Sequence, residues 1–254
     1  MKGDPKRNII YYVQNLRDGN SFSTRLVTAS QQGNTIFVLI ASFQIPHPQG
    51  QRVIDHQIKM PTVPPPEQVP TTEQYYMQLL EDPRCPELWK PFLQDRTKKS
   101  GAIDMRPVIV SDFFHRFGPP PSKDPNKFPQ ITDVPKQAMW MKTRNPLPDD
   151  PTVHAAVIAY ASDMGLLGTA KHNVSMPDMA VIASLDHAMW FHASFRADEW
   201  LLYVLESPRA TDGRGLAHGA IFRRDGTLVV TVAQEGVLRV RQPHSHRSIQ
   251  IGRL

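Results

Sequence analysis

An internal repeat constrains this chain more than any other feature of its sequence. Residues 9–42 align with residues 201–234 without a gap, and apolar positions match between the two copies. Each copy contains three apolar runs separated by turns that hold glycine, aspartate or asparagine. Such runs and turns form antiparallel hairpins, so each copy is predicted to be a three-stranded meander. The identical pairs include Tyr11 with Tyr203, Arg17 with Arg209, Thr35 with Thr227 and Ala41 with Ala233.

A helix is expected ahead of the second copy. Asp149-Asp150-Pro151 supplies an N-cap and a first-turn proline, which are typical helix-start signals. The equivalent segment of the first copy would precede Met1, so we expect the chain to begin part-way through its first repeat. A sheet without that helix would expose an apolar face. The helical spacing before the second copy is carried by Val153, Val157, Tyr160 and Met164.

Two proline-rich stretches separate the regular segments. Residues 60–70 (MPTVPPPEQVP) are interpreted as a linker, and a short amphipathic helix is predicted after them at Thr72 to Leu80. Residues 117–130 form a second proline-rich loop, between predicted strands at 102–114 and 137–144, and no chemistry is expected there.

Composition excludes several classes of protein. A hydrophobic content of 40% supports a packed core. The sequence has no run of about 18 apolar residues, as a membrane span needs, and no apolar leader, as a signal peptide needs. We therefore expect a soluble globular protein without a membrane span. The single cysteine, Cys85, permits no internal disulfide.

The formal charge of +5 would suit nucleic acid or a phosphorylated molecule such as coenzyme A. Because the basic residues are scattered and no nucleic-acid motif accompanies them, no nucleic-acid partner is predicted.

The stretch VIASLDHAMWFH, residues 181–192, places polar residues in what reads as a buried strand. Burying such groups without partners costs several kcal/mol, so they are satisfied locally or serve chemistry. On a regular strand Ser184 and Asp186 share one face, and His187 points to the other. Asp186 therefore either shares the face of Ser184 or caps a turn. The separation of His187 and His192 puts them on opposite strand faces, which argues against a shared metal site.

Several separated blocks resemble the acyl-CoA thioesterase II family: YASDMGLL, IASLDHAMWFHASFRADEWLLYVLESPRA, GRGLAHGAIFRRDGTLVVTVAQEG and, near the start, LRDGNSFSTRLVTA. This resemblance implies an α+β double hotdog, in which antiparallel sheets wrap a helix, with the first hotdog lacking its N-terminal helix. It assigns residues 1–60 to an incomplete first hotdog, 61–100 to the linker with its short helix, 101–241 to a second hotdog with the catalytic residues, and 242–254 to a basic tail.

The same resemblance implies hydrolysis of fatty acyl-CoA to free acid and coenzyme A, with no metal, no cofactor and no covalent acyl-enzyme. The family's catalytic residues fall on Asp163, Ser184 and Gln234. Water attacks a thioester poorly unless an acceptor takes its proton, so Asp163 would act as general base or orienter. Ser184 and Gln234 would fix the remaining hydrogen bonds of the water.

Other chemistries fit less well. Ser184, Asp186 and His187 suggest a Ser-His-Asp hydrolase, but no G-x-S-x-G elbow is present and His187 is predicted to point away from Ser184. The acid/base segment of a hotdog hydratase is also missing. The alternative from another class is a truncated, noncatalytic protein that binds acyl-CoA or a partner subunit, since the resemblance implies a leading segment that would precede Met1.

Two further expectations concern assembly and location. The exposed apolar sheet predicts a homo-oligomer. The final residues, Gly252-Arg253-Leu254, nearly match the Ser-Lys-Leu peroxisomal address, with glycine in place of serine. The resemblance implies relatives that are peroxisomal and end in such addresses, so a peroxisomal location is predicted, and a cytoplasmic one is the alternative.

Overall fold

The computed structural model describes residues 3–241, except 47, 49, 51, 84, 86, 99–100, 110–135, 172–173 and 175–178. Two compact units make up the chain, Met1–His56 and Gln57–Leu254. The proline-rich loop predicted at 117–130 and the C-terminal tail from residue 242 lie outside the described residues.

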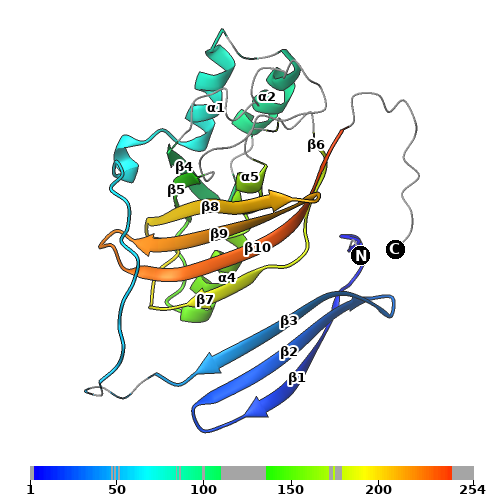
Figure 1. Ribbon diagram of the computed structural model, residues 1–254, viewed down its shortest axis with the longest axis vertical. Coiled ribbons are helices and arrows are strands. Elements are labelled where there is room, and N and C mark those ends of the chain that lie inside the picture. The colour runs from blue at the N-terminus through cyan, green and yellow to red at the C-terminus, as the bar shows by residue number, and fades with distance from the viewer. Residues whose placement is uncertain are drawn as a thin grey trace. The chain divides into compact units, whose positions relative to one another are not determined.

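The first unit is a three-stranded antiparallel sheet (blue in Figure 1). Its strands β1 (Ile10–Asp18), β2 (Phe22–Gln31) and β3 (Asn34–Gln44) pair in that order. The β2–β3 hairpin turns through Gln32 and Gly33 with φ of 51° and 77°, the positive angles that a two-residue turn requires. The meander predicted for the first copy is confirmed. No helix occurs among the described residues of this unit, and its sheet exposes the large apolar side chains Ile10, Tyr12, Val13, Leu39 and Ile40.

The second unit is built on one larger antiparallel sheet. Its described strands run in the order β4-β5-β8-β9-β10-β6, and β7 pairs with β10 beside β6. The second copy of the repeat forms three consecutive strands, which confirms its predicted meander. The bounds are β4 Ile103–Ile109, β5 Lys136–Thr143, β6 Met179–Ser184, β7 Ala188–Phe191, β8 Leu201–Thr211, β9 Arg214–Arg223 and β10 Leu228–Val240.

Helices α4 (Pro151–Ala161) and α5 (Leu166–Ala170) pack on one face of this sheet (Figure 1). Alternation along β8 places Tyr203 and Leu205 in the same core as Ile158 of α4. On the opposite face Leu202 packs with Trp140, and Met60 and Val63 from the proline-rich segment cover them. The first part of β8 is therefore buried on both faces, whereas its last four residues are exposed.

Helix α4 begins as the sequence predicts. The Asp150 side chain accepts a hydrogen bond of 2.8 Å from the Thr152 backbone, and Pro151 is the first helical residue. Of the residues at helical spacing, Tyr160 is 65% exposed and Met164 lies beyond the helix end. The buried residues of α4 are His154, Ile158 and Ala161.

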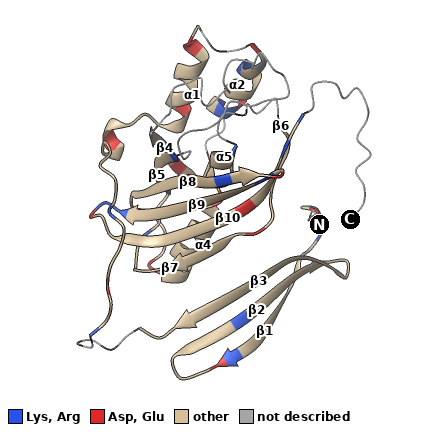
Figure 2. Cartoon of the chain, in the orientation of Figure 1, with Lys and Arg blue, Asp and Glu red and all other residues tan. Residues whose placement is uncertain are grey.

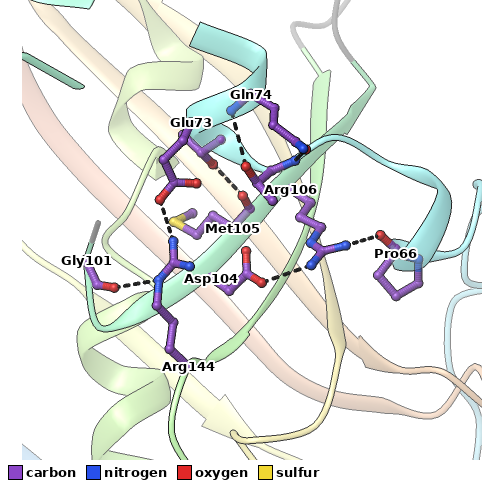
Figure 3. Close-up of polar contacts among 10 residues, drawn as sticks. Pro66, Glu73, Gln74, Gly101, Asp104, Met105, Arg106 and Arg144 are labelled. Atoms are coloured by element: carbon purple, nitrogen blue, oxygen red, sulfur yellow. Dashed lines mark hydrogen bonds and ion pairs between the residues drawn. The ribbon is translucent and has the colours of Figure 1, made fainter. Parts of the chain in front are cut away.

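The segment interpreted as a linker holds more structure than one helix. The predicted helix is α1 (Thr72–Glu81), and η2 (Glu87–Trp89) and α2 (Lys90–Lys98) follow it, after the short η1 (Pro66–Gln68). A small apolar cluster joins these helices and includes Cys85. Polar contacts tie α1 to the sheet (Figure 3): Glu73 pairs with Arg144, and the Thr72 hydroxyl donates to the carbonyl of Met105 on β4.

Charged residues are spread over both units. Figure 2 shows lysine and arginine on strands of the first unit and on helices and strands of the second, without a concentration on one element. In the described part of the chain, no helix combines the length and apolar character needed to cross a bilayer.

Candidate active site

Three side chains predicted from the sequence meet at one place in the second unit. Asp163 follows the end of α4, Ser184 ends β6, and Gln234 lies in β10. The Gln234 amide nitrogen Nε2 is 2.7 Å from Asp163 Oδ1 and 2.7 Å from Ser184 Oγ. The structure therefore brings together residues that are up to 71 positions apart in the sequence.

The turn that follows α4 leaves Asp163 exposed to solvent. Ser162 is the C-cap residue, and its backbone N–H donates to the carbonyl of Ile158. Gly165 then adopts a φ of 81° and begins α5. This left-handed conformation suits glycine and lets the chain turn sharply between two helices. Asp163 lies in that turn, outside the helical ladder, with its side chain exposed.

The pairing of β6 with β10 places Ser184 beside Gln234. Ser184 is opposite Gly236 in the register, and Gln234 is two residues earlier on β10. Gly236 is needed for close packing, because a Cβ there would lie 2.2 Å from Leu167 of α5. Helix α5 can thus approach the strand pair that carries both residues.

The hydrogen bonds of the site determine what each group can still do. Gln234 is 1% exposed, and both of its amide hydrogens are used, one for Asp163 and one for Ser184. Because Ser184 Oγ accepts, its own hydrogen is directed to no acceptor among the described residues and can bind an incoming group. Gln234 Oε1 is buried and has no partner within the described residues. The amide orientation follows from the carboxylate, which accepts only hydrogen-bond donors.

The stretch 181–192 is not one regular strand, contrary to the sequence prediction. Strands β6 and β7 both pair with β10, and Leu185, Asp186 and His187 form an irregular connection between them. Ser184 faces Gly236 whereas Ala188 faces Ala233, so this segment carries one residue more than the partner strand. The extra residue is a β-bulge, which re-aims the side chains that follow it.

The bulge decides the role of Asp186. Asp186 Oδ1 accepts a hydrogen bond of 2.9 Å from the backbone N–H of Glu235. The backbone N–H of Leu185 donates to the carbonyl of Glu235. Of the two alternatives left open, the structure supports the turn cap.

The bulge also overturns the predicted direction of His187. His187 Nε2 lies 2.9 Å from Ser162 Oγ, next to Asp163. It therefore points toward the site and not away from it. Burial lowers the pKa of His187, while the nearby carboxylates of Asp163 and Asp186 act in the opposite direction.

Neither histidine supports the competing chemistries. His187 contacts Ser162 and not Ser184, so no Ser-His-Asp relay forms through Ser184. His192 Nε2 instead lies 2.9 Å from Thr231 Oγ1. The described residues contain no cluster of three or more histidine, cysteine, aspartate or glutamate side chains that could hold a metal ion.

Two contributors to this region were missed by the sequence analysis. The hydroxyl of Tyr203 donates to the carbonyl of Ser162 at 2.6 Å, and Ser162 itself is fully buried. Ser162 stands directly before Asp163 in the YASD motif, and Tyr203 is one of the identities of the repeat. Their positions were visible in the sequence, but their contact depends on how α4 packs on the sheet.

The arrangement offers an exposed carboxylate and an exposed hydroxyl held at a fixed separation by a buried amide. A carboxylate can take a proton from water, and the hydroxyl can donate to an oxygen. Ser184 has no base in contact that would remove its proton, because its only described hydrogen-bond partner is the amide donor. The geometry therefore suits attack by water better than attack by serine.

Comparisons with known proteins identify the family of the chain. A family model described as acyl-CoA thioesterase matches residues 118–237, and one described as acyl-CoA thioesterase N-terminal domain matches residues 2–44. Human acyl-coenzyme A thioesterase 8 is 40% identical over 247 residues, which cover 94% of this chain and 70% of that protein. Acyl-CoA thioesterase 2 of Haemophilus influenzae is 33% identical, with 93% and 76% covered.

A more distant relative and two solved structures extend the similarity. The peroxisomal acyl-coenzyme A thioester hydrolase 1 of Saccharomyces cerevisiae is 25% identical, with 92% of this chain and 75% of that protein covered. The crystal structure of an acyl-CoA thioesterase II from Mycobacterium marinum matches with a TM-score of 0.69 and 36% identity, over 95% of this chain and 78% of that one. A hot dog fold protein from Alicyclobacillus acidocaldarius matches with a TM-score of 0.62 at 19% identity, over 92% and 73% of the two chains, and supports the fold alone.

Proposed function

The chain belongs to the acyl-CoA thioesterase II family and hydrolyses acyl-CoA thioesters, and from this premise we propose that Asp163, Ser184 and Gln234 direct a water molecule at the thioester carbonyl. The fold is the double hotdog of that family. The observation that carries the site assignment is the pair of 2.7 Å bonds by which Gln234 joins Asp163 and Ser184. The noncatalytic alternative is not favoured, because all three groups are present and Gln234 joins the other two by hydrogen bonds.

In this mechanism the attacking water lies between Asp163 and Ser184. Asp163 accepts one proton of the water as its oxygen bonds to the thioester carbon, and the Ser184 hydroxyl donates to the water oxygen and orients it. The carbon–sulfur bond then breaks, and the proton held by Asp163 passes to the departing thiolate. The products are the free acid and the coenzyme A thiol, so all atoms of water and thioester are accounted for.

Gln234 has a supporting role in this proposal. Its two N–H groups are already committed to Asp163 and Ser184, so it holds these residues in place and does not contact the water. A buried amide with one conformation fixes their separation more firmly than two exposed side chains could do alone.

Substitution of Asp163 by asparagine tests the assignment. The variant keeps the shape of the side chain and loses the proton acceptor, so kcat should fall by about 100-fold or more. Release of coenzyme A thiol from an acyl-CoA measures turnover, and circular dichroism checks the fold. Turnover close to that of the unmodified protein would show that Asp163 is not the base.

We further propose a peroxisomal location. The name of the yeast relative supports it, as does the similarity of Gly252-Arg253-Leu254 to a peroxisomal address. A fluorescent protein carrying the last dozen residues of the chain should enter peroxisomes, whereas the same fusion without Leu254 should stay in the cytosol. Diffuse signal from both fusions would reject import by this tail and favour the cytoplasmic alternative.

A further inference from the structure

Ser162 is held from two sides at the point where α4 ends. It is 0% exposed, and its carbonyl accepts the hydrogen bond from the Tyr203 hydroxyl at 2.6 Å. Its own hydroxyl lies 2.9 Å from His187 Nε2 and 3.0 Å from the carbonyl of Ala159. The next residue is Asp163, so any movement of Ser162 moves the carboxylate as well.

Building on the proposed function, we propose that Tyr203 and His187 form a clamp on Ser162 that positions Asp163 for catalysis. Neither residue needs to touch the substrate in this role. Both are positioning residues, and the name Ser162 clamp is used below for Ser162, Tyr203 and His187 together.

The Tyr203 half of the clamp is rigid. Tyr203 lies near the start of β8 with 0% exposure, and a Cβ on Gly219 of the neighbouring strand would be 2.5 Å from its ring. Glycine at that position therefore makes room for the ring. Carbonyl groups in the last turn of a helix lack intrahelical partners, and the Tyr203 hydroxyl supplies one. Burial raises the pKa of Tyr203, so its hydroxyl stays a donor across the neutral range.

The His187 half joins the two segments that carry the site. His187 follows the bulge after Ser184, and its bond to Ser162 reaches the segment that ends in Asp163. The bulge is itself anchored by Asp186 on the backbone of Glu235. Asp163 and Ser184 are thus connected twice, once through Gln234 and once through the His187–Ser162 bond. Two connections resist relative motion that one would permit.

The protonation state of His187 follows from the neighbours of Ser162. We assign the single hydrogen of the Ser162 hydroxyl to the Ala159 carbonyl, so that its oxygen accepts from His187 Nε2–H, because the other neutral tautomer would bury an Nδ1–H that has no acceptor among the described residues. Nδ1 is then unprotonated, and it is buried without a partner in the described part of the chain. Protonation would add a buried N–H without an acceptor and a positive charge beside Asp163. The carboxylate would then be a weaker base.

The charged and titratable groups around His187 come from several elements. Asp163 approaches from the end of α4, and Asp186 lies next to it in the bulge. Tyr203 of β8 lies across Ser162, and Glu235 of β10 holds Asp186 through its backbone. Because burial outweighs the two carboxylates, the pKa of His187 lies below its ordinary value. Its neutral form is the one present at neutral pH, and it is lost only on the acid side.

Conservative substitutions test the clamp. Tyr203→Phe removes one hydroxyl, and His187→Ala removes the imidazole, so each should lower kcat by about 10- to 100-fold while KM stays within about twofold. His187→Gln places an amide N–H where Nε2–H was, and it should recover most of the lost kcat. His192→Gln is the matched control, because His192 makes a similar bond to Thr231 and none to Ser162.

The pH profile separates positioning from simple structural support. The unmodified protein should lose kcat as His187 becomes protonated on the acid side, and His187→Gln should lack that step because an amide does not titrate. Thermal unfolding of each variant, followed by circular dichroism, shows whether folded protein is present at the assay temperature. A kcat loss explained by unfolding, or one that His187→Gln fails to recover, contradicts the clamp.

Asp163→Asn provides the reference that keeps the two proposals apart. If it abolishes turnover while Tyr203→Phe and His187→Ala match the unmodified protein, the clamp is wrong and the site assignment stands. If Asp163→Asn itself retains turnover, the site assignment is wrong.

Discussion

At the scale of single residues, the serine, the aspartate and both histidines of the stretch 181–192 each have an identified hydrogen-bond partner. Ser184 bonds to Gln234, Asp186 to the backbone of Glu235, His187 to Ser162 and His192 to Thr231. Satisfied hydrogen bonds explain why polar groups are tolerated in a strand-like sequence. Only the first of these contacts belongs to the proposed site directly, and three of the four serve to hold the chain in place.

Gln234→Glu gives a sharp test of the bridging amide. Glutamate has the same shape, but it cannot donate to Asp163 in its ionised form and would place two carboxylates in contact. One of the two must then bind a proton, which removes the base or costs stability. We expect kcat to fall by about 100-fold near neutral pH and the free energy of unfolding to fall by about 1–3 kcal/mol. Thiol release and urea unfolding measure the two effects, and unchanged kcat would contradict the bridging role.

At the scale of elements, the repeat predicted the two meanders because turn residues and apolar runs determine hairpins locally. Asp163, Ser184 and Gln234 could be selected only because their motifs resemble those of a family. Their convergence depends on long-range pairing of β6 with β10. The break between β6 and β7 was not predicted, since a single extra residue leaves the apolar pattern of 181–192 intact and yet reverses the direction of His187.

Helices were predicted with uneven success for a related reason. The start of α4 is encoded by Asp150 and Pro151, whose capping chemistry is local. Its buried face depends on which side meets the sheet, and the helical spacing alone did not show that Tyr160 is exposed. Helix α2, between Lys90 and Lys98, has few apolar residues and contains Pro91 in its first turn, so it gave little periodic signal.

At the scale of the whole molecule, the sheet of the first unit exposes many large apolar side chains. Tyr11 and Tyr203 occupy equivalent positions of the repeat, but Tyr11 is 62% exposed and Tyr203 is 0% exposed. Helix α4 and the neighbouring strands bury Tyr203, and the described residues of the first unit contain no such helix. Apolar surface of this kind favours association with another protein surface.

We therefore propose that the protein is a homo-oligomer whose stability depends on its concentration. Light scattering at micromolar concentration should give a mass above that of one chain, and the unfolding temperature should rise with protein concentration, because association stabilises the folded state. Ile40→Asn, on β3, should weaken association, since Ile40 is 64% exposed within the sheet. Ile54→Asn is the matched control, because Ile54 is 93% exposed in a segment without regular secondary structure. A stable monomer that unfolds cooperatively at the same temperature over a hundredfold range of concentration would rule out this assembly, and equal effects of the two substitutions would show that the β1–β3 sheet is not the associating surface.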